Sequence, residues 1–290
     1  MLVNNTALVL EGGGLRGMYT AGVLEYFMTQ SLYFKYNIGV SAGCSVAASY
    51  ISRQPGRTRT VNVDYVRDKR FLSIGNYIKN QEFLGLDFIY HTIPNELVPF
   101  DMDTFLKSKE DLVIVATDAH TANPIYYKKS DIKEDIMTAL RASSALPFMT
   151  QPVHFNGYTL YDGGIVDPIP YRRAMTDGYD KQIAILTRPV GYRKSERRHL
   201  MKLRRYPEVN KALSKRARLY NDTLDALEQR VTSNNAYIIQ PSVDLKVDRM
   251  EKDQRKLLKL YQLGYEDAKR HHKTLLDFIY EHEQIEKHIK

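Results

Sequence analysis

Two short apolar runs near the N-terminus each lead through a glycine-framed turn into a helical pattern, and this arrangement constrains the fold most. Residues 6–10 (TALVL) precede the turn 12–17 (GGGLRG), and residues 36–40 lead into the turn 39–43 (GVSAG). Continuous apolar runs bounded by glycine are typical of buried parallel strands. Strand, turn and helix repeated in this way indicate a parallel sheet covered by helices on both faces. The sequence therefore predicts an α/β fold.

Further elements extend this sheet along the chain. The same patterns predict strands at 111–116, 181–186 and 236–241, and a hairpin over 153–161 around Asn156-Gly157. Helices are predicted at 18–30, 42–52, 130–146, 208–231 and 248–286. We expect a catalytic α/β domain over residues 1–190. A basic, mainly helical C-terminal region over residues 191–290 is expected to pack against it.

Composition favours a globular protein of a reducing compartment. The 290 residues are 43% hydrophobic and 26% charged, which is ordinary for a folded domain. The first residues lack the pattern of a signal peptide, and no apolar run is long enough to span a bilayer. The single cysteine, Cys44, excludes an intramolecular disulfide and is expected to be a small packed side chain. These features predict a cytoplasmic location.

The net charge of +8 is concentrated in one segment. Residues 188–218, here the basic segment, contain twelve Lys or Arg and two Glu, so the rest of the chain carries about −2. Two interpretations stay open: a solvated helix face, or docking on the inner membrane surface, where each basic residue contributes about 1 kcal/mol. Nucleic-acid binding is not expected, since no recognised motif or interleaved aromatic residues accompany the charge.

Ser41 is the candidate nucleophile. It stands at a predicted strand-to-helix turn with Gly39 two residues before it and Gly43 two residues after it. Such a turn is too tight for side chains at the two flanking positions, and it projects the hydroxyl above the sheet edge. The N–H groups at the start of the following helix favour negative charge near that oxygen.

The first glycine turn is the candidate oxyanion hole. Gly12, Gly13 and Gly14 allow backbone N–H groups to approach a developing negative charge, and each such donor is worth roughly 3–4 kcal/mol of barrier. The turn does not match a Walker nucleotide loop, and Glu11 stands where a dinucleotide fingerprint needs glycine. Arg16 either adds a positive charge to the site or forms a local salt bridge.

Asp162 is the candidate base that removes the Ser41 proton. It opens Asp162-Gly163-Gly164 after the predicted hairpin, where the glycines allow backbone to desolvate the carboxylate and raise its basicity. An ordinary Asp-Gly turn is the alternative. A Ser-His-Asp triad would need a histidine after the acid. Five histidines satisfy this order but lie in charged helical segments: His199, His271, His272, His282 and His288.

Together, the segments 12–17, 39–43 and 162–164 resemble the patatin-like phospholipase family, as does 142–148 (ASSALPF) just before the aspartate. The resemblance covers about residues 6–190, and 68–101 and the C-terminal helices resemble a bacterial cytosolic subgroup. It implies a three-layer α/β fold with a mainly parallel sheet. It also implies hydrolysis of lipid esters by a Ser-Asp dyad without metal or cofactor. The residues implied are Ser41 as nucleophile, Asp162 as base, and Gly12, Gly13, Gly14 and Arg16 around the oxyanion.

Two further questions stay open from the sequence. The aromatic-rich stretch 71–90 either lines an acyl-chain groove, as a lid or wall, or packs in the core. Two rival functions also remain. One is a triad esterase or peptidase, and the other is a basic peripheral membrane-binding module whose serine site is vestigial. The sequence does not predict the lipid head group, the chain length, the positional preference or the oligomeric state.

Overall fold

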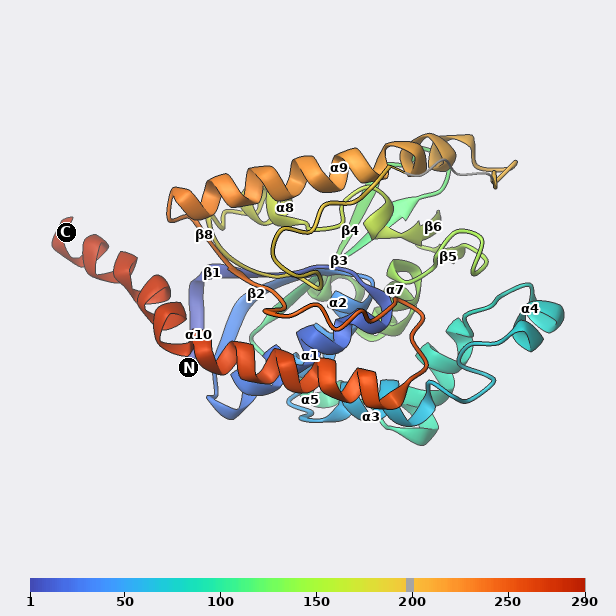
Figure 1. Cartoon of the computed structure of the whole chain (residues 1–290), viewed down its shortest axis with the longest axis horizontal. Helices are drawn as coiled ribbons and strands as arrows, with labels where there is room; N and C mark the ends of the chain where they lie inside the picture. The colour runs from blue at the N-terminus through green and yellow to red at the C-terminus, as the bar shows by residue number, and fades with distance from the viewer. Residues whose placement is uncertain (197–200, 290) are drawn as a thin grey trace.

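The computed structural model describes residues 1–196 and 201–289, and side chains up to residue 280. Within them, eight strands form one sheet in the order β5-β6-β3-β2-β1-β7-β8, with β4 paired to β3 (Figure 1). The adjacent strands β3, β2, β1, β7 and β8 run parallel to one another. Strand β3 also pairs antiparallel with β4 and with β6, and β6 pairs antiparallel with β5. The strands are β1 (Leu2–Leu10), β2 (Tyr33–Val40), β3 (Asp111–Asp118), β4 (Pro124–Lys128), β5 (Val153–Phe155), β6 (Tyr158–Asp162), β7 (Lys181–Ile185) and β8 (Ala236–Ile239).

Helices cover both faces of this sheet. In Figure 1, α8 and α9 lie over one face, and α1 and α10 lie under the other. The α-helices are α1 (Gly17–Thr29), α2 (Ala42–Ile51), α3 (Arg57–Tyr65), α4 (Ile74–Asn80), α5 (Met102–Lys107), α6 (Lys129–Ile132), α7 (Ile136–Ser143), α8 (Tyr171–Thr176), α9 (Pro207–Thr232) and α10 (Gln254–Ile289). The 3-10 helices are η1 (Gly14–Arg16), η3 (Lys133–Asp135) and η4 (Gly163–Ile165), and η2 (Phe88–Leu97) is a π-helix.

Successive residues of the central strands enter two separate cores. In β1, Ala7 and Val9 pack in the core beneath α8 and α9, whereas Leu8 and Leu10 pack with α1, α2 and α10. Because side chains alternate across a sheet, a strand buried on both faces is apolar throughout. The prediction of a three-layer α/β fold with a mainly parallel sheet is therefore confirmed.

The C-terminal segment joins both outer layers and the sheet. Strand β8 extends the sheet beside β7, as the sequence predicted. Helices α1 and α10 contact each other closely at Gly22 and Gly264. An added Cβ on Gly22 would lie 1.9 Å from the Tyr261 carbonyl oxygen, and one on Gly264 would lie 2.1 Å from the Tyr19 carbonyl oxygen. Only a residue without Cβ permits this backbone approach. The predicted division of the chain at residue 190 stays a prediction.

Two helix predictions need correction. The helix expected over 130–146 is interrupted: α6 ends at Ile132, Lys133 adopts φ +42°, and α7 begins at Ile136. The helix expected from residue 248 begins only at Gln254. Asp253 precedes it, and its carboxylate accepts a hydrogen bond of 2.9 Å from the Arg255 N–H, as a helix cap does. Strand β4 was not predicted.

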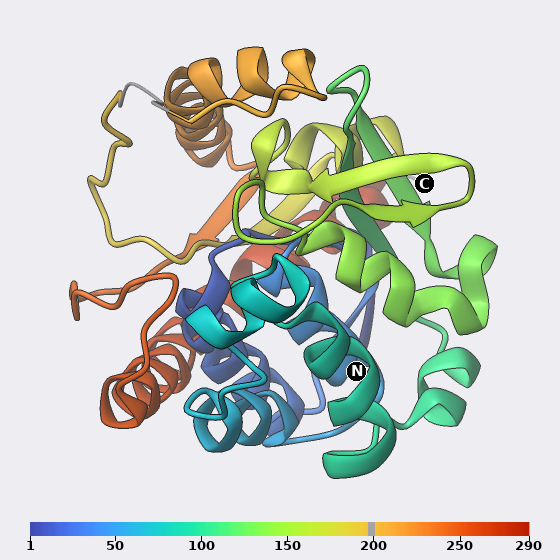
Figure 2. The same cartoon turned by 90° about the vertical axis from the view of Figure 1, so that its right-hand side faces the viewer.

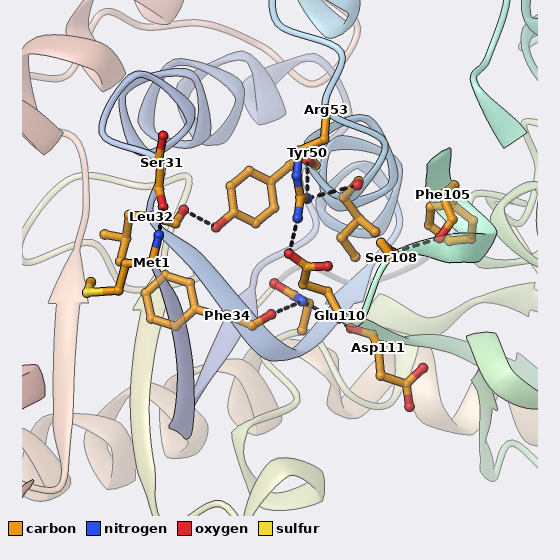
Figure 3. A network of polar contacts seen from close by, with 12 residues as sticks. Met1, Ser31, Leu32, Phe34, Tyr50, Arg53, Phe105, Ser108, Glu110 and Asp111 are labelled. Carbon is orange, nitrogen blue, oxygen red and sulfur yellow. Dashed lines mark hydrogen bonds and ion pairs between the residues drawn. The ribbon is translucent and has the colours of Figure 1, made fainter. Parts of the chain in front are cut away.

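A polar network ties the strand ends that lie opposite Ser41 (Figure 3). The Arg53 guanidinium, just after α2, forms an ion pair with the buried Glu110 carboxylate before β3. The Tyr50 hydroxyl donates to the Leu32 carbonyl at 2.5 Å, and the Asn37 amide donates to the carbonyl of Asp111 at 3.0 Å. This network fixes α2 against the sheet, and α2 in turn carries Ser41 at its first end.

Candidate active site

Ser41 occupies a strained turn between β2 and α2. Its backbone lies at φ +55° and ψ −125°, and the side chain is 7% exposed. An added Cβ on Gly39 would lie 2.7 Å from the Cys44 nitrogen, and one on Gly43 would lie 2.7 Å from the Leu10 carbonyl oxygen. The flanking glycines therefore leave no room for side chains, and backbone strain of this kind clusters at functional sites.

Ser143 holds this turn in place. Its hydroxyl accepts a hydrogen bond of 2.8 Å from the Ser41 N–H and donates one of 2.6 Å to the Val115 carbonyl. Sequence reasoning placed Ser143 in the segment 142–148 but gave it no role. Nothing local to that segment signals a partner 102 residues away.

Asp162 lies across β3 from Ser41. Strand β3 pairs with β2 on one side and with β6 on the other, so that the ends of β2 and β6 lie near each other. The Asp162 carboxylate accepts a hydrogen bond of 2.7 Å from the Gly164 N–H, and the nearby Ser41 side chain stabilises its charged form. An added Cβ on Gly163 would lie 2.3 Å from the Val115 carbonyl oxygen, so this close fit requires glycine.

Burial sets the basicity of Asp162. The residue is 3% exposed, and burial raises its pKa above the ordinary value because the charged form loses hydration. The positive charge of Arg216 and the hydrogen bonds from Ser41 and Gly164 oppose this rise. The structure thus places a carboxylate of increased basicity against a serine hydroxyl.

The loop of Gly12, Gly13 and Gly14 borders the same space. Within the described chain, the N–H groups of these three residues donate no hydrogen bond. An added Cβ on Gly12 would lie 3.2 Å from Cβ of Ser41, so the loop runs directly beside the serine. The next N–H, of Leu15, donates to the Arg249 carbonyl at 2.9 Å and anchors the loop to the segment before α10. Unpaired N–H groups beside a nucleophile are suited to bind an oxyanion.

Arg16 faces the polar side of this space. It is 8% exposed, its Nε has no hydrogen-bond partner, and it forms no ion pair among the residues described. Burial lowers the pKa of the Arg16 guanidinium to about 10, and the positive charge of Arg188 is the second largest cause. Arg16 lines the polar cavity, and its role at the oxyanion stays a prediction.

An apolar cavity of about 140 Å³ opens on one side of Ser41. The segment 68–101 supplies much of its wall, and in Figure 2 this segment, with α4 and η2, lies on the side facing the viewer. Its contribution comes from Phe71, Leu72, Leu84, Ile89, Tyr90, Ile93, Pro94 and Phe100. Because Phe71 and Ile93 are also buried, this segment both lines the groove and packs in the core. The Tyr90 hydroxyl contacts those of Ser144 at 2.6 Å and Ser45 at 3.0 Å.

A smaller, polar cavity of about 70 Å³ also borders Ser41 and adjoins the apolar one. Its wall holds the carboxylates of Glu11 and Asp162 and five cationic side chains: Arg16, Arg188, Lys194, Arg216 and Arg249. Three of these cations belong to the basic segment. The same segment also forms surface ion pairs, such as Arg193 with Asp225 at 2.8 Å, and its residues 197–200 lie outside the described chain. Sequence reasoning did not identify Arg249, because nothing near it in the chain resembles a site.

The late histidines lie away from the reacting groups where they are described, whereas the cysteine packs directly behind Ser41. The two cavity walls at Ser41 contain no histidine in the described chain. The His271 ring contacts the Tyr237 hydroxyl at 2.6 Å, and the His272 ring packs edge-on against Tyr26. His199 and the side chains of His282 and His288 lie outside the described residues. The Cys44 thiol donates to the Ser41 carbonyl at 2.9 Å, and burial raises its pKa to about 12, so it stays a neutral packed group.

No cluster of metal-ligating side chains occurs within the described part of the chain. The same part contains no helix with the length and apolar character that crossing a membrane requires. A metal site was not predicted from the sequence either, because His91, His120 and His154 lack ligand spacing.

Two family models match different stretches of the chain. Residues 8–175 match the family model of the patatin-like phospholipases, and residues 206–280 match a domain of unknown function (DUF6363). The uncharacterized protein YjjU of Escherichia coli (strain K12) is 33% identical over 188 residues, which cover 63% of this chain and 52% of YjjU. The chain thus spans about half the length of that curated relative.

Two solved structures also resemble the chain. VipD from Legionella pneumophila has 15% identity and a TM-score of 0.47, and the match covers 92% of this chain and 66% of VipD. The type III effector protein ExoU has 12% identity and a TM-score of 0.39, with coverage of 93% and 53%.

Proposed function

Because the chain belongs to the patatin-like phospholipase family, we propose that it is a serine acyl hydrolase that cleaves carboxylic ester bonds of lipids. One observation carries this proposal. The buried Asp162 carboxylate lies beside the Ser41 side chain, where the apolar and the polar cavities meet. A nucleophile beside a base, with space for substrate around it, is the arrangement that acyl transfer requires.

In the first step, Ser41 attacks the ester carbonyl. Asp162 takes the proton from the Ser41 hydroxyl as the new C–O bond forms, and its raised pKa makes it a stronger base than an exposed aspartate. The free N–H groups of Gly12, Gly13 and Gly14 then donate to the oxyanion. The Arg16 guanidinium adds a fixed positive charge on the polar side. Each lost donor is expected to raise the barrier by roughly 3–4 kcal/mol.

In the second step, the intermediate collapses and the alcohol leaves. Asp162 returns its proton to the leaving oxygen, and the acyl group stays bound to Ser41 as an ester. The apolar cavity has the lining to hold the acyl chain, and the alcohol departs on the polar side. Asp162 then deprotonates a water molecule that hydrolyses the acyl-Ser41 ester, which releases the fatty acid and restores the hydroxyl.

A fluorophosphonate probe tests this assignment, because it reacts with activated serines. We expect the full chain to be labelled, the Ser41→Ala variant to be unlabelled, and Asp162→Asn to be labelled at least about a hundredfold more slowly. Ser214→Ala, an exposed serine on α9, is the matched control and should label as the wild type does. Labelling that persists in Ser41→Ala would overturn the proposal. Loss of labelling in a folded His271→Ala or His272→Ala variant would favour a triad instead.

A further inference from the structure

The polar cavity beside Ser41 gathers an excess of positive charge from four parts of the chain. Arg16 comes from η1, Arg188 and Lys194 follow β7, Arg216 comes from α9, and Arg249 precedes α10. The charge of Arg249 acts on three of the other four cations, Arg16, Lys194 and Arg216, so these side chains face a common space. Five cationic groups thus share a cavity wall with two carboxylates.

The two carboxylates already accept hydrogen bonds from groups other than the five cations. Glu11 accepts hydrogen bonds from the Thr187 N–H at 2.5 Å, the Thr187 hydroxyl at 2.9 Å and the Tyr220 hydroxyl at 2.8 Å. Asp162 accepts a hydrogen bond from the Gly164 N–H, and the Ser41 side chain also stabilises its charge. Within the described chain, none of the five cations forms an ion pair with a carboxylate.

The close placement of these cations in a buried wall costs free energy. Arg16 is 92% removed from solvent and its Nε is unpaired. Burial, with the charges of Arg216, Arg249 and Arg16, lowers the pKa of Lys194 to about 7, and only Glu11 opposes them. Like charges held together in a buried wall repel one another and lose hydration. An anion with several oxygen atoms would relieve both costs through charge-assisted hydrogen bonds.

The position of the cavity indicates which part of a substrate it would hold. Ser41, Leu146 and Arg249 border both cavities, so the apolar and the cationic space adjoin at the serine. An ester whose acyl chain fills the apolar cavity therefore directs its alcohol portion into the cationic one. At about 70 Å³, the cationic cavity has room for a compact polar group but not for a second hydrocarbon chain.

We propose that the cationic cavity binds a phosphate group on the alcohol side of the scissile ester, which makes phosphorylated glycerol esters with a small head group the preferred substrates. This inference rests on the proposed hydrolase function of Ser41. Arg216 and Arg249 lie within 206–280, the segment that matches a domain of unknown function. That segment thus completes the substrate site that the N-terminal segment begins.

The first test compares two esters that differ only in the phosphate. The substrates are a 1-acylglycerol 3-phosphate and the 1-acylglycerol with the same acyl chain, both below their aggregation limits. We expect the wild type to favour the phosphorylated ester by at least about tenfold in kcat/KM. Arg249→Gln, whose backbone carbonyl still anchors Leu15, should lower this ratio about tenfold, as should Lys194→Gln. Arg218→Gln, an exposed cation of the same basic segment, should keep the wild-type ratio. Equal kcat/KM for the two esters would overturn the proposal.

The second test measures binding without catalysis. Calorimetry on the full-length Ser41→Ala variant uses glycerol 3-phosphate, inorganic phosphate and glycerol as separate ligands. We expect glycerol 3-phosphate to bind at least about tenfold more tightly than inorganic phosphate, and Arg249→Gln to weaken it about tenfold. Equal binding of inorganic phosphate would point to a free-phosphate site and overturn the substrate assignment, as would the absence of binding by both. Retained glycerol 3-phosphate binding in an enzyme that hydrolyses no ester would overturn the proposed function while it supports the phosphate site.

Discussion

The Ser143 hydroxyl bridges the N–H of Ser41 and the carbonyl of Val115, and so ties the candidate nucleophile to the neighbouring strand. Ser143→Ala leaves both backbone groups unpaired in a buried place. We expect this change to lower the free energy of unfolding by about 1–3 kcal/mol. We also expect kcat to fall by about tenfold, because the strained backbone of Ser41 loses a restraint.

Urea unfolding and burst kinetics separate these two effects. Ser130→Ala removes an exposed hydroxyl that contacts Asp131, so it should change neither value appreciably. Wild-type kcat in a destabilised Ser143→Ala variant would show that this bridge supports only the fold.

The acid limb of the activity profile should report Asp162. Burial raises the pKa of Asp162, and the base works only when it is deprotonated. Activity should therefore fall as pH decreases through a pKa higher than the ordinary aspartate value of about 3.9. The profile of kcat/KM for an uncharged ester measures this limb, and circular dichroism at each pH excludes unfolding. An acid limb at or below the ordinary aspartate value would contradict the role of burial.

The main elements were predictable from local patterns, and the family resemblance named Ser41 and Asp162 as a candidate dyad, which stays a prediction. Gly39, Ser41 and Gly43 mark a tight turn by their types and spacing, and the apolar runs mark buried strands. The contact between Ser41 and Asp162 was not predictable from the residues alone. It depends on β3 lying between β2 and β6, a pairing that distant segments decide.

The residues that line the cationic cavity could not be predicted from local sequence patterns. The charge of the basic segment was visible, but its division between surface and site was not. Arg216 lines the cavity whereas Arg218, two residues on in α9, pairs with Asp222 at the surface. Arg249 reaches the site only because the segment before α10 docks on the glycine loop. Such placement follows from tertiary packing, for which neither charge counts nor periodicity contains a signal.

Because α1 and α10 lie in close contact, even a methyl group added at Gly264 should lower the free energy of unfolding. In a helix, alanine is favoured over glycine by about 1 kcal/mol. In Gly264→Ala, however, the new methyl group would lie 2.1 Å from the Tyr19 carbonyl oxygen, so the helices must separate. We expect a net loss of about 1–3 kcal/mol of unfolding free energy and faster proteolysis of α10. Gly75→Ala in α4, where the nearest atom lies 3.5 Å away, is the control and should not destabilise. A stabilised Gly264→Ala variant would contradict this packing.

The ion pair of Arg53 with Glu110 should affect stability without affecting catalysis. It lies at the strand ends opposite Ser41, and Glu110 is 3% exposed (Figure 3). Glu110→Gln should lower the free energy of unfolding by about 1–3 kcal/mol, because the neutral amide bonds the guanidinium less strongly. Asp103→Asn breaks an exposed pair with Lys107 and should leave the free energy of unfolding almost unchanged. Urea unfolding measures both, and kcat/KM should stay within about twofold. A large loss of activity in folded Glu110→Gln would mean that this network also controls the site.

Lys194 should make phosphate binding depend on pH near neutrality. Burial, and next the positive charges of Arg216, Arg249 and Arg16, lower the pKa of Lys194 to about 7, and the charge of Glu11 opposes them. A bound phosphate favours the charged amine and raises that pKa, so binding takes up a proton. Affinity is therefore highest below pH 7 and declines as pH rises above it, until the pKa of the bound state is passed.

Glycerol 3-phosphate binding to Ser41→Ala at pH 7 and pH 9 tests this, since the ligand, with a second pKa of about 6, is a dianion at both values. We expect affinity to fall about tenfold or more between them. Calorimetry in buffers of different ionisation enthalpy should detect the proton uptake at pH 7.5. Adding Lys194→Gln should abolish the uptake and flatten the pH dependence, because the other cations of the cavity wall are arginines and stay protonated over this range. A pH dependence that survives in Lys194→Gln would assign the titrating group elsewhere.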